Sequence, residues 1–146
     1  MTRMTARQLA VQLLFSMEAN HLSPEEAAGL FFSEEHYDTL KDEDSIYAEP
    51  PDEEQMLYIR RLTDTAYSHL EEIDEVIARY SKGWKLSRLP KTTLAVLRCA
   101  ICEILFMDDI PDAVAVDEAV EQGKRYDSPE GGAFINGLLG SFLRDR

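Results

Sequence analysis

Apolar residues recur three and four positions apart along most of the 146-residue chain, and no stretch alternates apolar and polar positions as a half-buried strand would. The spacing predicts helices over residues 3–19, 24–37, 52–67, 69–80, 90–107, 112–126 and 129–143. The segment 90–107 is apolar on almost every face, which is typical of a helix at the centre of a core. The pattern therefore predicts an all-α fold with about seven helices.

Short local motifs predict where several of these helices begin. Ser23-Pro24-Glu25-Glu26 and Ser68-His69-Leu70-Glu71 both have the spacing of a capping box, and Ser128 precedes Pro129 at the start of the last helix. Between the second and third helices, the acidic segment 38–53 with its double proline predicts a loop.

The last predicted helix contains the pair Asn136-Gly137, which elsewhere favours a turn. Ser128-Pro129 outweighs that preference, so the pair is expected inside a helix, where a glycine costs about 1 kcal/mol relative to alanine. We expect the close approach of a neighbouring helix at Gly137 and Gly140 to be the main reason for these two glycines.

The formal net charge of −13 disfavours general attraction to nucleic acid or to anionic membranes, but the charge is unevenly distributed. Residues 18–80 hold 18 acids and 4 bases, whereas residues 81–107 hold 5 bases and one acid. Polyanion binding is therefore expected only on a local patch: the first helix, the 82–91 loop, or Lys124 and Arg125. The N-terminus predicts an amphipathic helix rather than a targeting segment, and no stretch has the ~18 apolar residues of a membrane span, so the sequence predicts a cytoplasmic protein.

Motifs that carry chemistry in other proteins are weak in this chain. Cys99-Ala100-Ile101-Cys102 lies in the middle of a predicted buried helix rather than at a helix start, so packing cysteines are expected. Glu18-Ala19-Asn20-His21 supplies half of a di-iron motif, and neither His36 nor His69 supplies the other half. Asp42-Glu43-Asp44 begins a calcium-loop-like run that lacks a ligand at its fifth position and a glycine at its sixth. We therefore expect no enzyme activity, no metal and no cofactor.

Two features favour binding instead. Arg3 and Arg7 lie one helical turn apart and project from one face of the first helix. The start of the last helix presents backbone N–H groups that suit a phosphate, and Gly131 and Gly132 leave room for its approach. Phe134 is placed either to stack on a base or to fill the core. Ordinary surface arginines and a core phenylalanine are the structural alternatives.

Three blocks of the sequence resemble the transcription antitermination factor NusB family. They are ARQLAVQLLFSME (6–18), WKLSRLPKTTLAVLRCAICEILF (84–106), and IPDAVAVDEAVEQGKRY (110–126) followed by FINGLL (134–139). The resemblance covers most of residues 3–143. It implies one NusB-like domain over residues 1–146, with an N-terminal helix and two packed three-helix subdomains, about 1–81 and about 82–146.

The resemblance also implies a function and the surfaces that perform it. NusB-like proteins pair with NusE, a small-subunit ribosomal protein, and together they bind boxA-type single-stranded RNA on nascent ribosomal RNA transcripts, in an elongation complex with other Nus factors. Carried onto this chain, the RNA-binding residues are Arg3, Arg7, Lys124, Ser128, Glu130, Gly131, Gly132 and Phe134. The NusE-facing residues are Arg88, Lys91, Thr92 and Thr93. Monomer and homodimer both stay open, because some NusB-like proteins self-associate and mask the RNA surface.

The N-terminus departs from the family, whose members often carry a denser arginine cluster there. With only Arg3 and Arg7 in a chain of net charge −13, we expect weak RNA binding by the protein alone and strong dependence on NusE. Two alternatives remain open. One is a partner-binding helical protein with weakened RNA binding, and the other is an accessory NusB-like domain of an RNA-modifying system.

Overall fold

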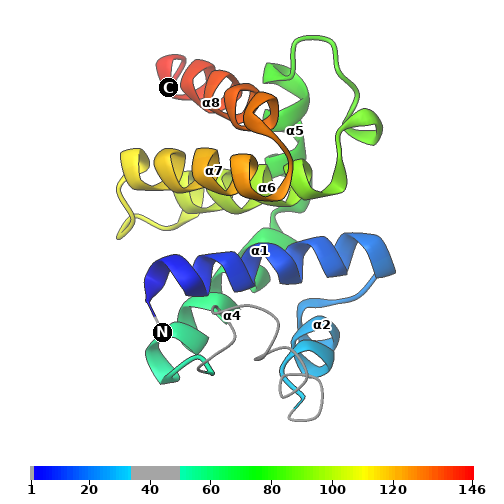
Figure 1. Ribbon diagram of the computed structural model, residues 1–146, viewed down its shortest axis with the longest axis vertical. Coiled ribbons are helices and arrows are strands. Elements are labelled where there is room, and N and C mark those ends of the chain that lie inside the picture. The colour runs from blue at the N-terminus through cyan, green and yellow to red at the C-terminus, as the bar shows by residue number, and fades with distance from the viewer. Residues whose placement is uncertain (1, 34–49) are drawn as a thin grey trace. The chain divides into compact units, whose positions relative to one another are not determined.

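The computed structural model describes residues 2–33 and 50–146, and within these ranges all regular secondary structure is helical (Figure 1). Seven α-helices and one short 3-10 helix are present there, which confirms the predicted all-α class. The helix predicted over residues 24–37 is shorter than expected, because α2 ends at Phe31 and residues 32–33 are not helical. Residues 34–37 with His36, most of the acidic 38–53 segment and the calcium-loop-like run lie outside the described residues. The chain divides into two compact units, Met1–Tyr67 and Ser68–Arg146.

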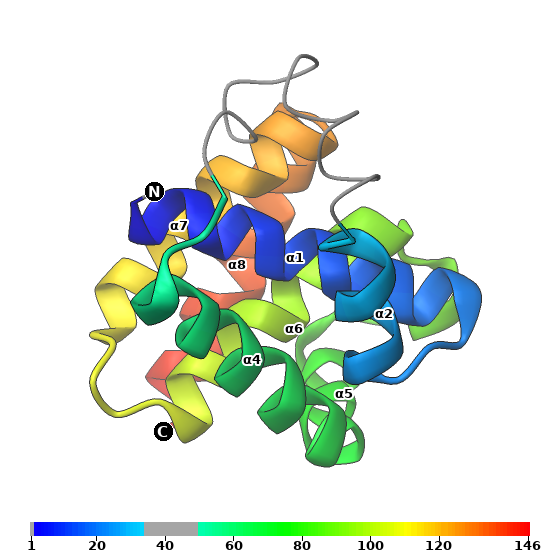
Figure 2. The ribbon, with the colours of Figure 1, turned by 90° about the horizontal axis from the view of Figure 1, so that it is seen from below.

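The first unit contains α1 (Arg3–Asn20), α2 (Pro24–Phe31) and α4 (Glu53–Ser68), which Figure 2 shows together. The predicted capping box at α2 is confirmed. The Ser23 hydroxyl accepts from the Glu26 N–H at 3.2 Å, and the Glu26 carboxylate accepts from the Ser23 N–H at 3.0 Å. The hydrogen bond from the Ser23 backbone, followed by that from its hydroxyl, lowers the pKa of the Glu26 carboxyl below its usual value.

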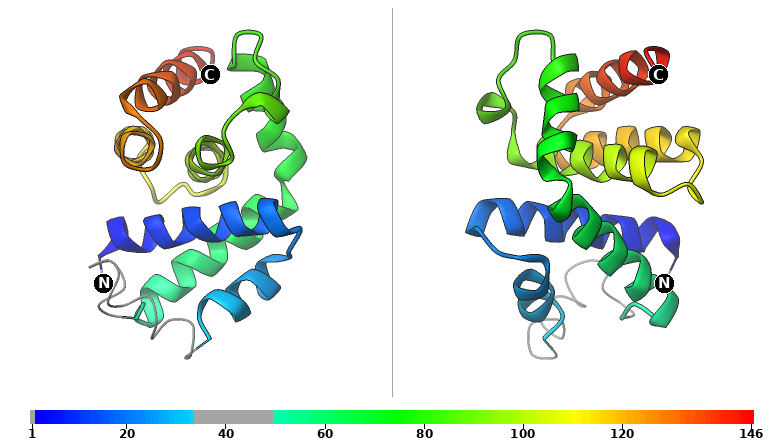
Figure 3. Two further views of the ribbon diagram at one scale, coloured as in Figure 1. Left: turned by 45° about the vertical axis from the view of Figure 1, so that its right-hand side comes forward. Right: turned by 180° about the vertical axis from the view of Figure 1, so that it is seen from behind.

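The second unit contains α5 (Leu70–Tyr80), the 3-10 helix η2 (Leu86–Arg88), α6 (Lys91–Phe106), α7 (Asp112–Tyr126) and α8 (Pro129–Arg144). Every residue of α6 from Thr93 to Ile104 is buried, as its apolar pattern predicts. Figure 3, left, looks almost along α6 and α7 and shows them side by side, and α8 packs on α7.

Helix α5 packs on α6 and α8 of this second unit, although the sequence grouped residues 69–80 with the first subdomain. A bidentate ion pair joins α5 to α6: Arg98 Nε lies 2.9 Å from Asp74 Oδ1, and Arg98 Nη2 lies 2.8 Å from Asp74 Oδ2. At its other end, the Tyr80 hydroxyl donates to Asp145 Oδ2 at 2.9 Å, and this hydrogen bond raises the pKa of Tyr80. The paired charge and the bidentate geometry hold α5 in one register against α6.

The capping box predicted at Ser68 is wrong. Helix α4 continues through Ser68, so this residue has helical backbone and cannot adopt the extended conformation of an N-cap. His69 is the N-cap of α5 and makes no side-chain capping bond to the backbone; its Nδ1 lies 3.2 Å from Glu72 Oε1 instead. The start of α5 was predicted to within one residue, but the residue that caps it and the hydrogen bonds of that cap were not.

Within the described ranges, none of the helices is both long and apolar enough to cross a membrane.

Candidate nucleic-acid interface

The first turn of α8 is closed by bonds within the chain. Ser128 is its N-cap, as predicted, and its Oγ accepts from the Gly131 N–H at 3.0 Å. The Gly132 N–H donates to the Ser128 carbonyl oxygen at 3.0 Å. Pro129 has no N–H. Most backbone donors that suited a phosphate in the sequence therefore already have partners.

Carboxylates also flank this helix start. The Ser128 hydroxyl donates to Asp127 Oδ2 at 3.3 Å, and Glu130 is exposed in the first turn. Both carboxylates interact favourably with the positive end of the helix dipole and so stabilise α8, and both repel an approaching phosphate. Any polyanion at this end of α8 meets that repulsion first.

The glycines of the α8 start have a packing role. A methyl group on Gly132 would lie 2.7 Å from Lys124 Cγ and 3.2 Å from the Val120 carbonyl oxygen, and one on Gly131 would overlap the Asp127 carboxylate. On the facing helix, a methyl on Gly123 would lie 3.2 Å from Gly132 Cα. Helices α7 and α8 thus meet backbone to backbone at Gly123 and Gly132.

The predicted close approach at Gly137 and Gly140 is wrong. A methyl on Gly137 would meet no described atom within 4 Å, and one on Gly140 would meet only Arg144 Nη1, a mobile side-chain end of the same helix, at 3.4 Å. Periodicity places both glycines on α8 but does not identify the glycine that faces a partner helix.

The cations beside the α8 start come from the last turn of α7. Lys124 and Arg125 are both exposed, with Lys124 Nζ 3.5 Å from Glu121 Oε1 and the Arg125 guanidinium 5.9 Å from the Tyr126 ring centre. Phe134 is half-buried, so part of its ring is open to solvent. The structure therefore brings Lys124, Ser128, Glu130 and Phe134 to one end of the α7–α8 pair, as a local cluster of both charge signs.

The arginine pair of α1 is organised by two residues of α4 that the sequence did not single out. Arg3 Nε donates to Gln55 Oε1 at 3.2 Å, and its guanidinium carbon lies 4.2 Å from the centre of the Tyr58 ring. The Arg7 guanidinium carbon lies 5.8 Å from the same ring. Arg3 is half-buried, whereas Arg7 is only 3% exposed. The pair does share one face, and Arg3 is its accessible member.

The predicted partner-facing residues are consecutive around the start of α6. Arg88, the last residue of η2, and Lys91 are exposed, Thr92 is half-buried and Thr93 is buried. Thr93 Oγ1 has no hydrogen-bond partner among the described residues. No acid lies in the first turn of α6, and its N-cap, Pro90, provides no side-chain cap. Unlike the start of α8, which has Glu130 in its first turn, the start of α6 has no acid in its own first turn to interact with the positive end of the helix dipole.

The two cysteines of the C-x-x-C motif are buried and form no disulfide, as a packing role predicts. Cys99 Sγ lies 3.8 Å from Glu103 Oε1 within α6. No group of three or more histidine, cysteine, aspartate or glutamate residues that could hold a metal ion occurs in the described ranges, and His21 ends α1 in a left-handed conformation.

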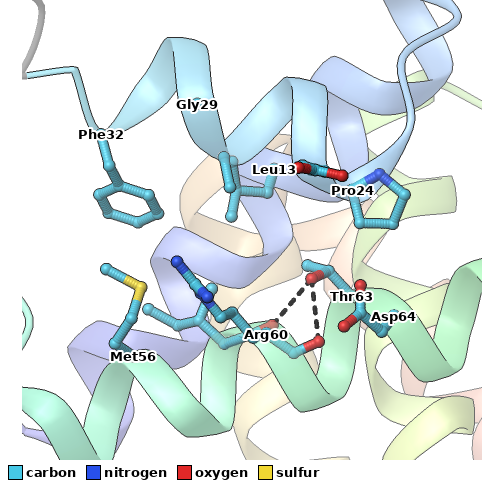
Figure 4. A pocket seen from close by; sticks show the side chains of 11 residues that line it. Leu13, Pro24, Gly29, Phe32, Met56, Arg60, Thr63 and Asp64 are labelled. Carbon is cyan, nitrogen blue, oxygen red and sulfur yellow. Dashed lines mark hydrogen bonds between the residues drawn. The ribbon is translucent and has the colours of Figure 1, made fainter.

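A groove of about 500 Å³ lies between α2 and α4 of the first unit (Figure 4). Its polar lining comprises Glu25, Arg60, Thr63 and Asp64, with Leu13, Phe32 and Met56 among the apolar residues. The Thr63 hydroxyl donates to the carbonyl oxygens of Ile59 and Arg60, at 2.9 and 3.3 Å, so it is held by its own helix. The groove therefore contains no hydroxyl activated by a neighbouring base.

The fold and the local sequence define a helical protein of a known family. The NusB family model matches residues 4–144. The transcription antitermination protein NusB of Symbiobacterium thermophilum is 38% identical over 144 residues, covering 99% of this chain and 90% of the relative, and that of Thermoanaerobacter sp. (strain X514) is 39% identical over 145 residues, covering 99% and 92%. The chain belongs to the NusB family.

Solved structures agree with this assignment. A crystal form of T. maritima NusB superposes with a TM-score of 0.82 at 29% identity, covering 100% of this chain and 93% of that one. The antitermination factors NusB and NusE in complex with dsRNA give a TM-score of 0.78 at 22% identity, covering 99% and 97%, which shows the fold alone.

Proposed function

We propose that this protein is a transcription antitermination factor that, together with NusE, binds boxA-type single-stranded RNA on nascent ribosomal RNA transcripts. The observation that carries the proposal is the family match across residues 4–144, together with relatives named as transcription antitermination proteins that match this chain over 90–92% of their own length. The NusB relative solved with NusE and dsRNA supports the choice of partners. The role requires no catalytic step, and we place it in the cytoplasmic elongation complex with other Nus factors.

The proposed RNA contacts come from each unit separately. In the first unit they are Arg3, which is accessible, and Arg7, which is buried. In the second unit the exposed cations Lys124 and Arg125 lie at the end of α7, and the carboxylates of Asp127 and Glu130 at the start of α8 oppose them. Three to four phosphate contacts correspond to a fall of about 2–3 units in log K per decade of salt for single-stranded RNA. We therefore expect weak binding by the protein alone.

The proposed NusE surface is the start of α6, with Arg88, Lys91, Thr92 and Thr93. Arg88 and Lys91 are exposed and therefore available to a partner, whereas Thr93 is buried. Binding of NusE here supplies the additional RNA contacts that an acidic chain lacks.

Fluorescence anisotropy of a labelled boxA-type RNA tests the proposal directly. The RNA is titrated with this protein, with and without equimolar NusE, at two salt concentrations. Tight binding only in the presence of NusE is the expected result. Sub-micromolar binding by the isolated protein in physiological salt contradicts the expected dependence on NusE, and an RNA of scrambled sequence is the control for specificity.

A second candidate function is partner binding without RNA binding, and the closed α8 start together with the burial of Arg7 favours it. In that case NusE association persists while boxA affinity is absent with or without NusE. Comparing Arg3→Ala with Arg7→Ala separates the two functions. Loss of RNA binding in Arg3→Ala with NusE binding intact supports the RNA-binding function, and unchanged behaviour of both variants supports the partner-only function.

A further inference from the structure

The connection between α5 and α6, whose course Figure 1 shows, carries an exposed aromatic residue and several exposed basic residues. Trp84 is 58% exposed; among the large apolar residues of the described chain, only Leu30 and Leu57, both at 64%, are more exposed. Around it, Lys82, Lys85, Arg88 and Lys91 are all exposed. From residue 81 to residue 102 the sequence contains no acid, although the whole chain has a net charge of −13.

The backbone holds Trp84 in a defined position. Ser81 is fully buried, and its hydroxyl donates to the carbonyl oxygens of Trp84 and Ala78, at 2.7 and 3.1 Å. The Trp84 N–H donates to the Ser81 carbonyl oxygen at 3.3 Å, which closes a tight turn. Lys82 and Gly83 occupy the left-handed region, with φ of 53° and 91°. For a lysine this conformation is unfavourable, so the turn is imposed by its surroundings.

The other side of Trp84 is anchored as well. The Arg88 N–H donates to the Lys85 carbonyl oxygen at 2.8 Å within η2, and Leu89 is only 8% exposed. The loop that carries Trp84 is therefore anchored on both sides by a buried residue, Ser81 before it and Leu89 after it, while the indole is exposed to solvent. Tyr80, the residue before Ser81, donates a hydrogen bond to the carboxylate of Asp145.

We propose that the loop tip, formed by Lys82, Gly83, Trp84 and Lys85, is a contact site for single-stranded RNA in which Trp84 stacks on an unpaired base and the two lysines contact phosphates. Stacking on an aromatic ring beside a positively charged track is the general mode of sequence-tolerant single-strand binding. The acid-free first turn of α6 adds its positive dipole end to the same field. Charge complementarity favours a polyanion over a protein as the occupant.

The site goes beyond the proposed function, because it requires neither the boxA sequence nor NusE. It places RNA on the loop tip and leaves the α6 start, from Arg88 to Thr93, to the protein partner.

Trp84 is the only tryptophan of the chain, so its fluorescence reports on this site alone. Single-stranded oligouridine is added to the full chain at low ionic strength. We expect saturable quenching of Trp84 by the single strand and much weaker quenching by duplex RNA of equal length, because paired bases are not free to stack. Equal quenching by the duplex, or no quenching while a labelled strand still binds, overturns the proposal. So does the absence of any binding.

Variants measured by anisotropy of labelled oligouridine give the second readout. We expect Trp84→Ala to bind about 5-fold or more weakly, and Trp84→Phe to retain part of the affinity. The matched control is Tyr67→Ala, which removes a 52% exposed ring from α4 and should leave affinity unchanged. The double variant Lys82→Asn with Lys85→Gln should reduce the salt slope by about 1.4, since each contact contributes about 0.7; asparagine tolerates the left-handed backbone at residue 82.

Titration with NusE alone separates RNA from protein as the occupant. If NusE without RNA changes the Trp84 fluorescence, and Trp84→Ala weakens NusE binding but not oligouridine binding, the loop tip is a protein contact and the proposal is wrong.

Discussion

The contact between α7 and α8 predicts that alanine substitutions at two helical glycines, Gly123 and Gly137, have different effects on the stability of the protein. Replacing Gly123 by alanine introduces a methyl carbon 2.5 Å from Ile135 Cδ1 and 3.2 Å from Gly132 Cα, whereas carbon atoms in good contact are about 3.5–4.0 Å apart. Ile135 is fully buried, and the Gly132 atom belongs to the α8 backbone, so neither yields easily. Overpacking of this kind costs about 1–3 kcal/mol.

Gly137→Ala is the matched control, because its methyl group is exposed and meets no described atom within 4 Å. Both substitutions gain about 1 kcal/mol of helix propensity, so that contribution cancels in the comparison. We expect Gly137→Ala to raise the free energy of unfolding by up to about 1 kcal/mol. Gly123→Ala should be about 1–3 kcal/mol less stable than Gly137→Ala, because only the cost of overpacking distinguishes the two variants.

Urea unfolding followed by circular dichroism measures both variants against the parent chain. Ile135→Val provides the internal test, because it removes the Cδ1 atom that the new methyl group meets. Alone it should cost about 0.5–1.5 kcal/mol, and in the Gly123→Ala background it should cost less or restore stability. Equal stability of Gly123→Ala and Gly137→Ala, or strict additivity with Ile135→Val, would refute the backbone contact as the reason for Gly123.

Three further predictions concern the helix starts. Ser128→Ala removes the cap of α8 and should lower the free energy of unfolding by about 1 kcal/mol in the same urea assay; no loss would mean that the Gly131 N–H finds another partner. NMR titration should give Glu26 a pKa below the usual value of a glutamate, and Ser23→Ala should return the pKa toward that value. Because the pKa of Glu26 is lower in the folded state, this capping box stabilises the protein above the unfolded-state pKa, and the contribution is lost as the pH falls through the folded-state pKa. A Glu26 pKa that Ser23→Ala leaves unchanged would contradict Ser23 as the cause of the shift. Glu130→Gln should strengthen boxA binding measured with NusE and slightly reduce stability; unchanged RNA affinity would exclude the α8 start as a phosphate site.

The sequence determined the helical elements because their causes are local. Periodic apolar positions gave α6 and α7 to within a residue or two, and Ser23 and Ser128 gave caps that the structure confirms. The family blocks are also a property of the sequence alone, and the family match over residues 4–144 confirms that assignment. Two helix boundaries were exceptions: α2 ends at Phe31 rather than near residue 37, and α4 runs one residue further than its own pattern required.

Only the tertiary structure decided what each side chain meets. Gly123 and Gly132, rather than Gly137 and Gly140, allow two helices to touch, because the angle at which α8 crosses α7 selects the facing residues and helical spacing does not. In the same way, Tyr58 and Gln55 engage the arginine pair from a helix about fifty residues away, which no local pattern records. Contacts between distant segments depend on how the helices pack, and for that reason the sequence named Arg3 and Arg7 but could not show that only Arg3 remains accessible.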